Sequence, residues 1–441
     1  MLLKPSHYNH CFSIDDYHVL WNIWSNGILK LTSDELEVCQ SILHSPNIPT
    51  SNIHYNGFRA LLHGNSFLIS SEFNEIDNIK KRYINHINSK QNHSIAIILT
   101  FACNFKCIYC HQEHVNKTIS SSTIRELMNY IKKNIKSGDK LHIAWWGGEP
   151  LLQISAIDEI GKLIKDYCMK NKCIFETSIV TNGYLLNEIN IDTISKYNLK
   201  SAQITIDGNK ELHDMQRKLS DENNTYDTIL KNLKVLIKKA PSLSVTLRCN
   251  IMEKHLSKKT WNLFFNDLQP LAQNLSISIN SAVPCTKCQF TEVSPSDYST
   301  LVNYLHDEMH TYNLKPSSTE IKPGICRCGT LPINNFFLDP EGFVFKCTDI
   351  THNGIGAVGK LSSGEINSNG FKSEWKEFNP FIIDRCKKCS LLPLCMGGCP
   401  KIENTKKDLQ KQCLFKSVFR QWGKRLLTLK TGDKNGPRTQ H

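Results

Sequence analysis

The chain has 441 residues, of which 40% are hydrophobic and 21% charged, a composition typical of a globular protein with two or three domains. No basic and apolar signal sequence opens it. Its longest apolar run, 95–102, is far shorter than the ~20 residues of a membrane helix. We therefore expect a cytoplasmic protein with no membrane partner. In that reducing compartment its 18 cysteines favour metal ligation over a disulfide framework.

The net charge of +12 is concentrated at the C-terminus, where residues 401–441 carry 11 Lys and Arg against 3 Asp and Glu. Such a tail can attract nucleic acid. Between 409 and 429, however, the basic residues are interspersed with Leu, Phe and Trp, which favours the solvated face of an amphipathic helix. We therefore expect no nucleic-acid partner, and we expect 426–441 to be disordered.

Residues 1–85 predict a small separate module. The expected strands are 12–14, 17–24, 28–31 and 66–70. Asn26-Gly27 supplies a hairpin turn between the second and third strands. A helix capped by Thr32 or Ser33 follows the third strand, and a second helical stretch covers 55–62.

From residue 94 to 310, apolar strands alternate with helical segments. The strand candidates are 95–100, 142–146, 175–180, 202–206, 244–250 and 276–280. The helical segments include 123–135, 154–170, 226–239 and 256–271, and Thr123 with Glu126 can form a capping box on the first of these. Continuous apolar strands joined by helical crossovers predict an α/β domain with a parallel sheet curled into a barrel or part of one.

Past residue 310 this rhythm breaks. Gly, Pro and Cys become dense, and we expect no further helix before about Glu403. A stretch so poor in regular structure needs cross-links or metals to stay folded. We assign 311–425 to a Cys-rich domain.

Three cysteines, Cys103, Cys107 and Cys110, lie in a C-x3-C-x2-C loop directly after the first barrel strand. Three thiolates at this spacing can hold three irons of a cubane cluster and leave the fourth iron open to a small molecule. A zinc knuckle or a chance pattern is the alternative. In parallel barrels the active site gathers at the carboxyl ends of the strands, which is where this loop falls.

Further polar motifs follow the next strands at the same end. They are Gly147-Gly148-Glu149-Pro150, Thr181-Asn182-Gly183, and Thr205-Ile206-Asp207-Gly208 followed by His213-Asp214 and Arg217. The two glycines permit close backbone approach, so carbonyls and the Glu149 carboxylate could receive an ammonium group. Taken singly, each motif could equally be a plain turn. Arg248 and Asn250 on the fifth strand are weaker candidates.

The C-terminal cysteines form a second pattern: Cys328, Cys347, Cys386, Cys389, Cys395, Cys399 and Cys413, with Gly342 between the first two. A zinc ribbon is the alternative for the four-cysteine run, but zinc fingers prefer two separated pairs, and these gaps are uneven. Five cysteines outside both patterns are interpreted as buried thiols: Cys11, Cys39, Cys168, Cys173 and Cys249.

Together these motifs resemble radical S-adenosylmethionine (SAM) enzymes of the peptide-modifying branch, which carry a Cys-rich SPASM extension. The resemblance covers roughly 94–415. It implies a partial (β/α)6 TIM-type barrel and an N-terminal module similar to winged-helix elements that capture a leader peptide as an added strand. A purely structural N-terminal cap is the alternative for that module.

The resemblance also implies ligands. Cys103, Cys107 and Cys110 would hold a [4Fe–4S] cluster, with Tyr109 against adenine. Gly147, Gly148 and Glu149 would receive the SAM amino group, and Arg217 and Thr205 the carboxylate and ribose. Two auxiliary [4Fe–4S] clusters would use Cys328, Cys347 and Cys399, and Cys386, Cys389, Cys395 and Cys413. The first set lacks a fourth ligand, for which Cys326 is one candidate and the pair Cys285 and Cys288 another; its fourth iron could also be open.

In such enzymes a reduced cluster cleaves SAM to methionine and a 5′-deoxyadenosyl radical that abstracts hydrogen from a polypeptide. We therefore expect a maturase that cross-links a ribosomally made precursor peptide through a C–C, ether or thioether bond, supplied with electrons by a protein such as flavodoxin or ferredoxin. The layout, with His7-Tyr8-Asn9 ahead of Asp15-Asp16-Tyr17, is similar to maturases that join aromatic residues, such as the darobactin maturase.

Two alternatives remain open. Anaerobic sulfatase-maturing enzymes oxidise Ser or Cys to formylglycine, and in them a base Asp follows the cysteine that matches Cys347. Here Thr348 takes that place and Asp349 comes next. A non-enzymatic iron–sulfur electron-transfer protein would explain the cysteines but not the strand-end motifs.

Overall fold

The structure is a computed structural model that describes residues 1–14, 16–221, 223–282, 290, 293–317, 323–348, 353–371 and 374–400. The chain divides into two compact units. Unit 1 comprises 1–88 with the described parts of 319–332 and 374–441, and unit 2 comprises 89–318 and 333–373. The domain boundaries given above stay a prediction. In the described ranges, no helix is long and apolar enough to cross a membrane.

Unit 2 is built on one large sheet with the strand order β14-β13-β12-β10-β9-β8-β6-β15-β16-β17-β18. Its parallel centre contains the six predicted strands: β6 (Asn92–Ile98), β8 (Lys140–Trp146), β9 (Ile174–Thr181), β10 (Leu199–Thr205), β12 (Ser244–Ile251) and β13 (Leu275–Ser281). The strand order has two ends, so the barrel is open. The predicted α/β partial barrel is confirmed.

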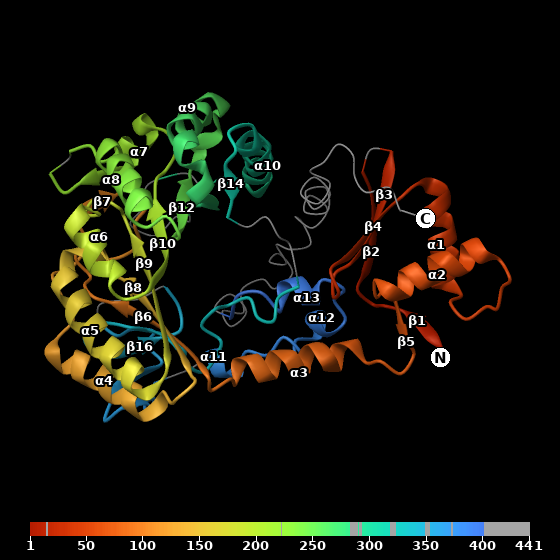
Figure 1. Cartoon of the computed structure of the whole chain (residues 1–441), viewed down its shortest axis with the longest axis horizontal. Coiled ribbons are helices and arrows are strands. Elements are labelled where there is room, and N and C mark those ends of the chain that lie inside the picture. The colour runs from red at the N-terminus through yellow and green to blue at the C-terminus, as the bar shows by residue number, and fades with distance from the viewer. Residues whose placement is uncertain are drawn as a thin grey trace. The chain divides into compact units, whose positions relative to one another are not determined.

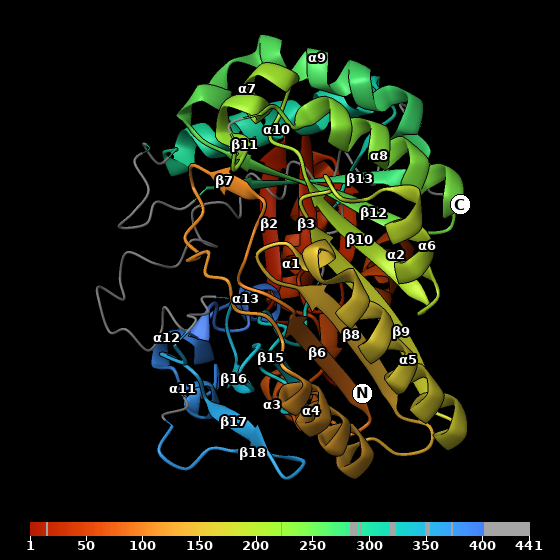
Figure 2. The same ribbon diagram turned by 90° about the vertical axis from the view of Figure 1, so that its left-hand side faces the viewer.

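Helices connect these strands and cover one face of the sheet, as Figures 1 and 2 show for α4, α5, α6 and α8. They are α4 (Ser121–Asn134), α5 (Ile154–Asn171), α6 (Glu188–Ser195), α7 (Lys210–Gln216), α8 (Tyr226–Lys239), α9 (Lys258–Leu268) and α10 (Pro295–Thr311), with 3-10 turns η1 (Pro150–Gln153), η2 (Glu253–Leu256) and η3 (Gln269–Asn274). The predicted capping box at Thr123 is wrong. Ser120 is the N-cap and accepts from the Thr123 N–H at 3.1 Å, while the Thr123 hydroxyl bonds the Pro340 carbonyl at 2.8 Å.

The chain after α10 extends the sheet at both edges. β14 (Lys315–Pro316) adds to β13, and β15 (Asn335–Leu338) runs parallel to β6. From β15 the chain folds into the antiparallel strands β16 (Phe343–Phe345), β17 (Gly359–Ser362) and β18 (Glu365–Asn367). Part of the Cys-rich segment is thus regular sheet continuous with the barrel.

Unit 1 contains the predicted N-terminal module. Its strands are β1 (Leu3–Pro5) paired with β5 (Leu68–Ser70), and the antiparallel sheet of β2 (Asn9–Ile14), β3 (Tyr17–Asn22) and β4 (Gly27–Leu31). Its helices are α1 (Ser33–His44), α2 (Ile53–Gly64) and α3 (Glu75–Ile87). Of the two predicted caps, Thr32 or Ser33, the structure has Thr32, which caps α1 in a capping box with Glu35. The α3 helix was not predicted, although Asn74 caps it.

The N-terminal module shares a core with the Cys-rich residues of its own unit. That core joins Val19, Trp21, Ile79 and Tyr83 to Leu331, Phe378, Phe381, Leu392 and Leu394, among others. The short helices α11 (Glu374–Glu377), α12 (Asp384–Lys387) and α13 (Leu392–Cys395) lie in this segment, so the expectation that no helix precedes Glu403 is wrong. The N-terminal 88 residues are therefore part of what keeps the cysteine segment folded.

Candidate active site

The Cys103 loop follows β6 and is fixed from two sides. Its short strand β7 (Phe105–Cys107) pairs with β11 (Arg217–Leu219), which places Cys107 opposite Arg217. The Ile108 N–H donates to the Gln216 carbonyl at 3.1 Å, and the Asn182 amide donates to Asn104 Oδ1 at 2.8 Å. The cysteine loop and the Arg217 segment are thus one hydrogen-bonded substructure, which the sequence did not reveal.

The two glycines after β8 let the backbone pack against this loop. The Gly148 N–H donates to the Thr100 carbonyl at 2.9 Å and the Glu149 N–H to the Ala102 carbonyl at 3.0 Å. A Cβ at Gly147 would lie 2.6 Å from the Thr100 oxygen, and one at Gly148 only 2.3 Å from the Ala102 oxygen. The predicted close backbone approach is therefore present, and its partner in the structure is the cysteine loop.

The Glu149 carboxylate is fully buried and its oxygens already accept three protein hydrogen bonds. Leu151 N–H and the Thr181 hydroxyl donate to Oε1 at 3.0 and 2.7 Å, and Asn182 N–H donates to Oε2 at 2.8 Å. Burial raises the pKa of Glu149, and these hydrogen bonds oppose that shift. The carboxylate thus ties the ends of β8 and β9 together, and its role as acceptor of an ammonium group stays a prediction.

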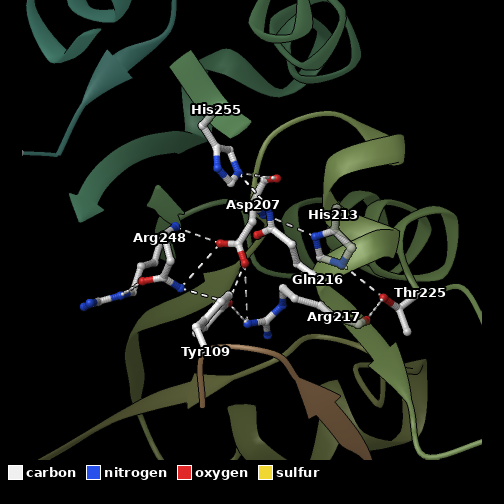
Figure 3. Close-up of polar contacts among 9 residues, drawn as sticks. Tyr109, Asp207, His213, Gln216, Arg217, Thr225, Arg248 and His255 are labelled. Carbon is white, nitrogen blue, oxygen red and sulfur yellow. Dashed lines mark hydrogen bonds and ion pairs between the residues drawn. The ribbon is translucent and has the colours of Figure 1, made fainter. Parts of the chain in front are cut away.

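A buried polar network joins the ends of β10 and β12 to Tyr109 (Figure 3). The Tyr109 hydroxyl donates to Asp207 and accepts from Arg217, and the Asn250 amide also donates to it at 3.0 Å. Asp207 is 0% exposed, accepts from the Asn250 N–H at 2.7 Å and pairs with Arg217 at 3.9 Å. Asn250, a weak candidate from sequence, is therefore part of the site, and Arg248 bonds its side chain at 3.0 Å.

His213 and Asp214 support this network from behind. His213 Nδ1 accepts from the Asp207 N–H at 3.2 Å, so its Nε2 carries the proton and bonds the Thr225 hydroxyl at 3.0 Å. That hydroxyl donates to the Arg217 carbonyl at 2.7 Å. Burial, then the nearby Arg217 cation, holds the pKa of His213 well below its usual range. Asp214 caps α8 by accepting from the Thr225 and Tyr226 N–H groups, both at 2.9 Å.

Three groups remain available for a polar ligand. Arg217 Nε and Gln216 Oε1 are buried and have no hydrogen-bond partner in the described part of the chain. Thr205, whose hydroxyl lies at the end of β10, is a buried residue with 8% of its surface exposed. A buried donor without a partner costs about 1–3 kcal/mol, which a bound carboxylate would offset. These orphaned atoms fit SAM, as the resemblance implies for Arg217 and Thr205.

The three thiols fit an iron–sulfur cluster in chemistry and place. All are partly buried, and the Phe105 N–H points at Cys103 Sγ at 3.4 Å. Burial raises the pKa of Cys103 to about 12 and of Cys107 to about 11, while Arg217 partly opposes both shifts. No group of three His, Cys, Asp or Glu side chains among the described residues converges on a single metal ion. A cubane instead binds each thiolate to a different iron.

The C-terminal cysteines divide between the units. Cys326, Cys328, Cys386, Cys389, Cys395 and Cys399 lie in unit 1, and Cys347 lies in unit 2. Cys413, Cys285, Cys288 and Asp349 lie outside the described residues. In unit 1 Cys326 Sγ bonds the Cys328 carbonyl at 2.9 Å, and Cys386 and Cys389 border the shared core. Both auxiliary ligand sets stay predictions.

Residues 97–254 match the Radical SAM superfamily profile. A Cys-type anaerobic sulfatase-maturating enzyme from Clostridium perfringens is 24% identical over 69% of this chain and 88% of its own length. The radical SAM cyclopropyl synthase TigE from Paramaledivibacter caminithermalis is 27% identical, covering 76% of this chain and 74% of its own.

Two sets of solved structures share the fold. The structure of anSMEcpe with bound AdoMet superposes with a TM-score of 0.57 at 19% identity, covering 74% of this chain and 93% of that one. Streptococcus suis SuiB bound to the precursor peptide SuiA gives 0.51 at 14% identity, covering 92% and 98%. With the cysteine loop, the strand-end network and the open barrel in place, residues 97–254 form a radical SAM domain, which makes the protein an enzyme.

Proposed function

We propose that this enzyme matures a ribosomally made precursor peptide by abstracting hydrogen and forming a C–C, ether or thioether cross-link. The main support for this proposal is the share of the chain that has the fold of a peptide-modifying enzyme. The likeness to SuiB with its precursor peptide covers 92% of this chain, against 74–76% for the anSMEcpe structures. Residues 1–88 are about a fifth of the chain, so most of them fall within the larger likeness.

The radical SAM family implies a [4Fe–4S] cluster and SAM as cofactors. When bound, the reduced cluster supplies the electron that splits SAM and generates the hydrogen-abstracting group. Cys103, Cys107 and Cys110 would hold that cluster. Arg217 and Gln216 would bind the polar end of SAM, because these residues carry buried atoms without partners. Tyr109 would present its ring to adenine, with its hydroxyl anchored by Asp207.

The rest of the proposal concerns partners. Two auxiliary clusters on the ligand sets named above would bring the total to three, and a flavodoxin- or ferredoxin-like protein would supply electrons. The leader of the precursor would add as a strand to the sheet of unit 1. Both β2 and β4 are edge strands of that sheet, but His10 on β2 bonds the Ser390 carbonyl at 3.3 Å. We therefore favour β4 (Gly27–Leu31).

Deleting residues 1–85 would not test leader binding, because the deletion removes half of the core shared with the cysteine segment. Hydrogen–deuterium exchange on the intact enzyme is the better experiment. Added leader peptide should slow exchange at β4 amides, whereas a scrambled leader should not. If the leader slows exchange in neither β2 nor β4, the module is a structural cap and does not bind the leader.

The reaction itself is tested by anaerobic co-expression with the short open reading frame beside the gene, followed by tandem mass spectrometry. Each cross-link should remove two hydrogens from the precursor. The second candidate is sulfatase maturation, favoured by the sequence likeness to the Clostridium perfringens enzyme. Formylglycine in a sulfatase-derived peptide, with an unmodified precursor, would establish that alternative. The assignment as an enzyme sets aside the electron-transfer-protein interpretation.

A further inference from the structure

Two cysteines outside every cluster motif lie together where α5 meets β9. The helix ends with Lys172 in the left-handed conformation at φ 56°, and the Cys173 N–H donates to the Cys168 carbonyl at 2.9 Å. This is the Schellman helix end, which brings the side chains at its two ends into contact, ordinarily as an apolar pair. Here both members of the pair are thiols.

The two thiols are coupled, and one of them is anchored to the backbone. The Cys173 S–H donates to the Lys136 carbonyl at 3.1 Å. Each thiol also shifts the pKa of the other. At this kind of helix end the two side chains face each other, which is the arrangement that a disulfide requires.

The two thiols differ in access. Cys168 is 2% exposed and Cys173 is partly exposed. Both line a surface cavity of about 420 Å³ with Met169, Phe175, Lys196 and Tyr197, among others. A reagent would thus meet Cys173 first. The pair lies at the amino end of β9, one strand length or about 23 Å from the active-site end, so it is separate from the SAM site.

We propose that Cys168 and Cys173 form an oxidisable dithiol site, which a small disulfide such as glutathione disulfide converts into an intramolecular disulfide. The Cys173 thiolate attacks the reagent, giving a mixed disulfide and releasing one thiol. Cys168 then loses its proton and attacks Cys173 Sγ, which releases the second thiol. Two S–H bonds are lost, one S–S bond forms, and the reagent takes up both electrons and both protons.

Burial sets the rate of this reaction. It raises the pKa of both thiols, that of Cys168 to about 12. Since the thiolate is the nucleophile, the reaction should be slow at neutral pH and accelerate in mildly alkaline solution. Cys39 and Cys249 are 0% exposed and belong to no such pair among the described residues, so they are internal controls.

The test uses the full-length enzyme, purified anaerobically, incubated with glutathione disulfide at about pH 8.5, alkylated and digested with trypsin. Lys165, Lys170, Lys172 and Lys196 are cleavage sites. The disulfide therefore appears as peptide 166–170 joined to peptide 173–196. We expect this species to form at least about tenfold faster than any modification of Cys39 or Cys249.

Single variants separate the two roles. Cys168→Ser should trap Cys173 as a stable mixed disulfide with glutathione, whereas Cys173→Ser should leave Cys168 unmodified. The proposal is overturned if the wild-type enzyme accumulates glutathione on Cys173 without the linked peptides. It is also overturned if both cysteines are still reduced after the incubation and are therefore recovered as alkylated peptides. Equally fast linkage in concentrated guanidinium would also overturn it, because proximity in sequence would then suffice.

Discussion

Replacing Glu149 with Gln separates a structural role of this carboxylate from a role as SAM ligand. Glutamine matches the shape of glutamate but offers one acceptor oxygen instead of two, together with an NH2 donor. In the protein, three donors converge on the carboxylate: Leu151 N–H, the Thr181 hydroxyl and Asn182 N–H.

The expected cost follows from these contacts. The Thr181 hydroxyl can rotate to accept from the new NH2 group, but a backbone N–H cannot. Whichever way the amide is turned, either Leu151 N–H or Asn182 N–H loses its acceptor in a buried place. An orphaned buried donor costs about 1–3 kcal/mol, and replacing charge-assisted bonds by neutral ones adds to this. Relief of the buried charge offsets part, so we expect a net loss of about 2 kcal/mol, roughly 30-fold in the folding equilibrium.

The assay is urea unfolding followed by tryptophan fluorescence, paired with calorimetric titration of SAM. Glu188→Gln is the matched control. It makes the same chemical change on an exposed carboxylate whose contact with Lys239 is 3.4 Å long, and should change stability by less than about 0.5 kcal/mol. If Glu149→Gln keeps wild-type stability but loses SAM binding, the carboxylate is a ligand group and the structural argument is wrong.

Three further predictions concern metal, cofactor and pH. Reconstituted enzyme should hold about twelve irons, and changing Cys103, Cys107 and Cys110 together to Ala should leave about eight and abolish SAM cleavage; 5′-deoxyadenosine from that variant would contradict the assignment. Arg217→Lys keeps the charge but lacks Nε, so the Kd for SAM measured by equilibrium dialysis should rise about tenfold; an unchanged Kd would exclude Arg217 as a ligand. Burial raises the pKa of Asp339 to about 6, so its stabilising contribution is present at low pH and lost as pH rises through 6. In the wild type this group should lower the unfolding free energy by about 1.4 kcal/mol between about pH 5 and pH 7.5, and Asp339→Asn should lack that decrease. Plots of unfolding free energy against pH that run parallel for the two proteins would refute this.

The barrel was predictable because its signal is local. Six apolar strands at regular intervals, each followed by an amphipathic helix, fix a parallel sheet whatever the details of packing. The helix α3 was missed because its apolar residues, Ile76, Ile79, Tyr83 and Ile87, are diluted by polar neighbours. Their spacing of three and four residues was the available signal.

The cap of α4 could not be predicted from the local sequence. Ser120 and Thr123 both fit a helix start, and sequence gives no basis for choosing between them. The Thr123 hydroxyl instead bonds Pro340, in a turn more than 200 residues away. Likewise, nothing local in Trp21 or Leu392 says that they share a core. Long-range partners decide both questions, and a single sequence does not contain them.

The structure brings together the motifs that the sequence placed at the strand ends, but several motif residues make contacts that position alone could not assign. Their hydrogen bonds go to protein groups: Glu149 bonds the ends of β8 and β9, His213 bonds the Asp207 backbone and the Thr225 hydroxyl, and Asp214 caps α8. Few atoms are left over for a ligand, and two of these belong to Arg217 and Gln216. A preorganised site needs such bracing, because a buried guanidinium is costly unless its surroundings hold it where the ligand arrives. The residues between Asp207 and Arg217 therefore serve to hold the Arg217 cation in place. We expect substitutions in these bracing residues to weaken SAM binding at Arg217, the proposed ligand.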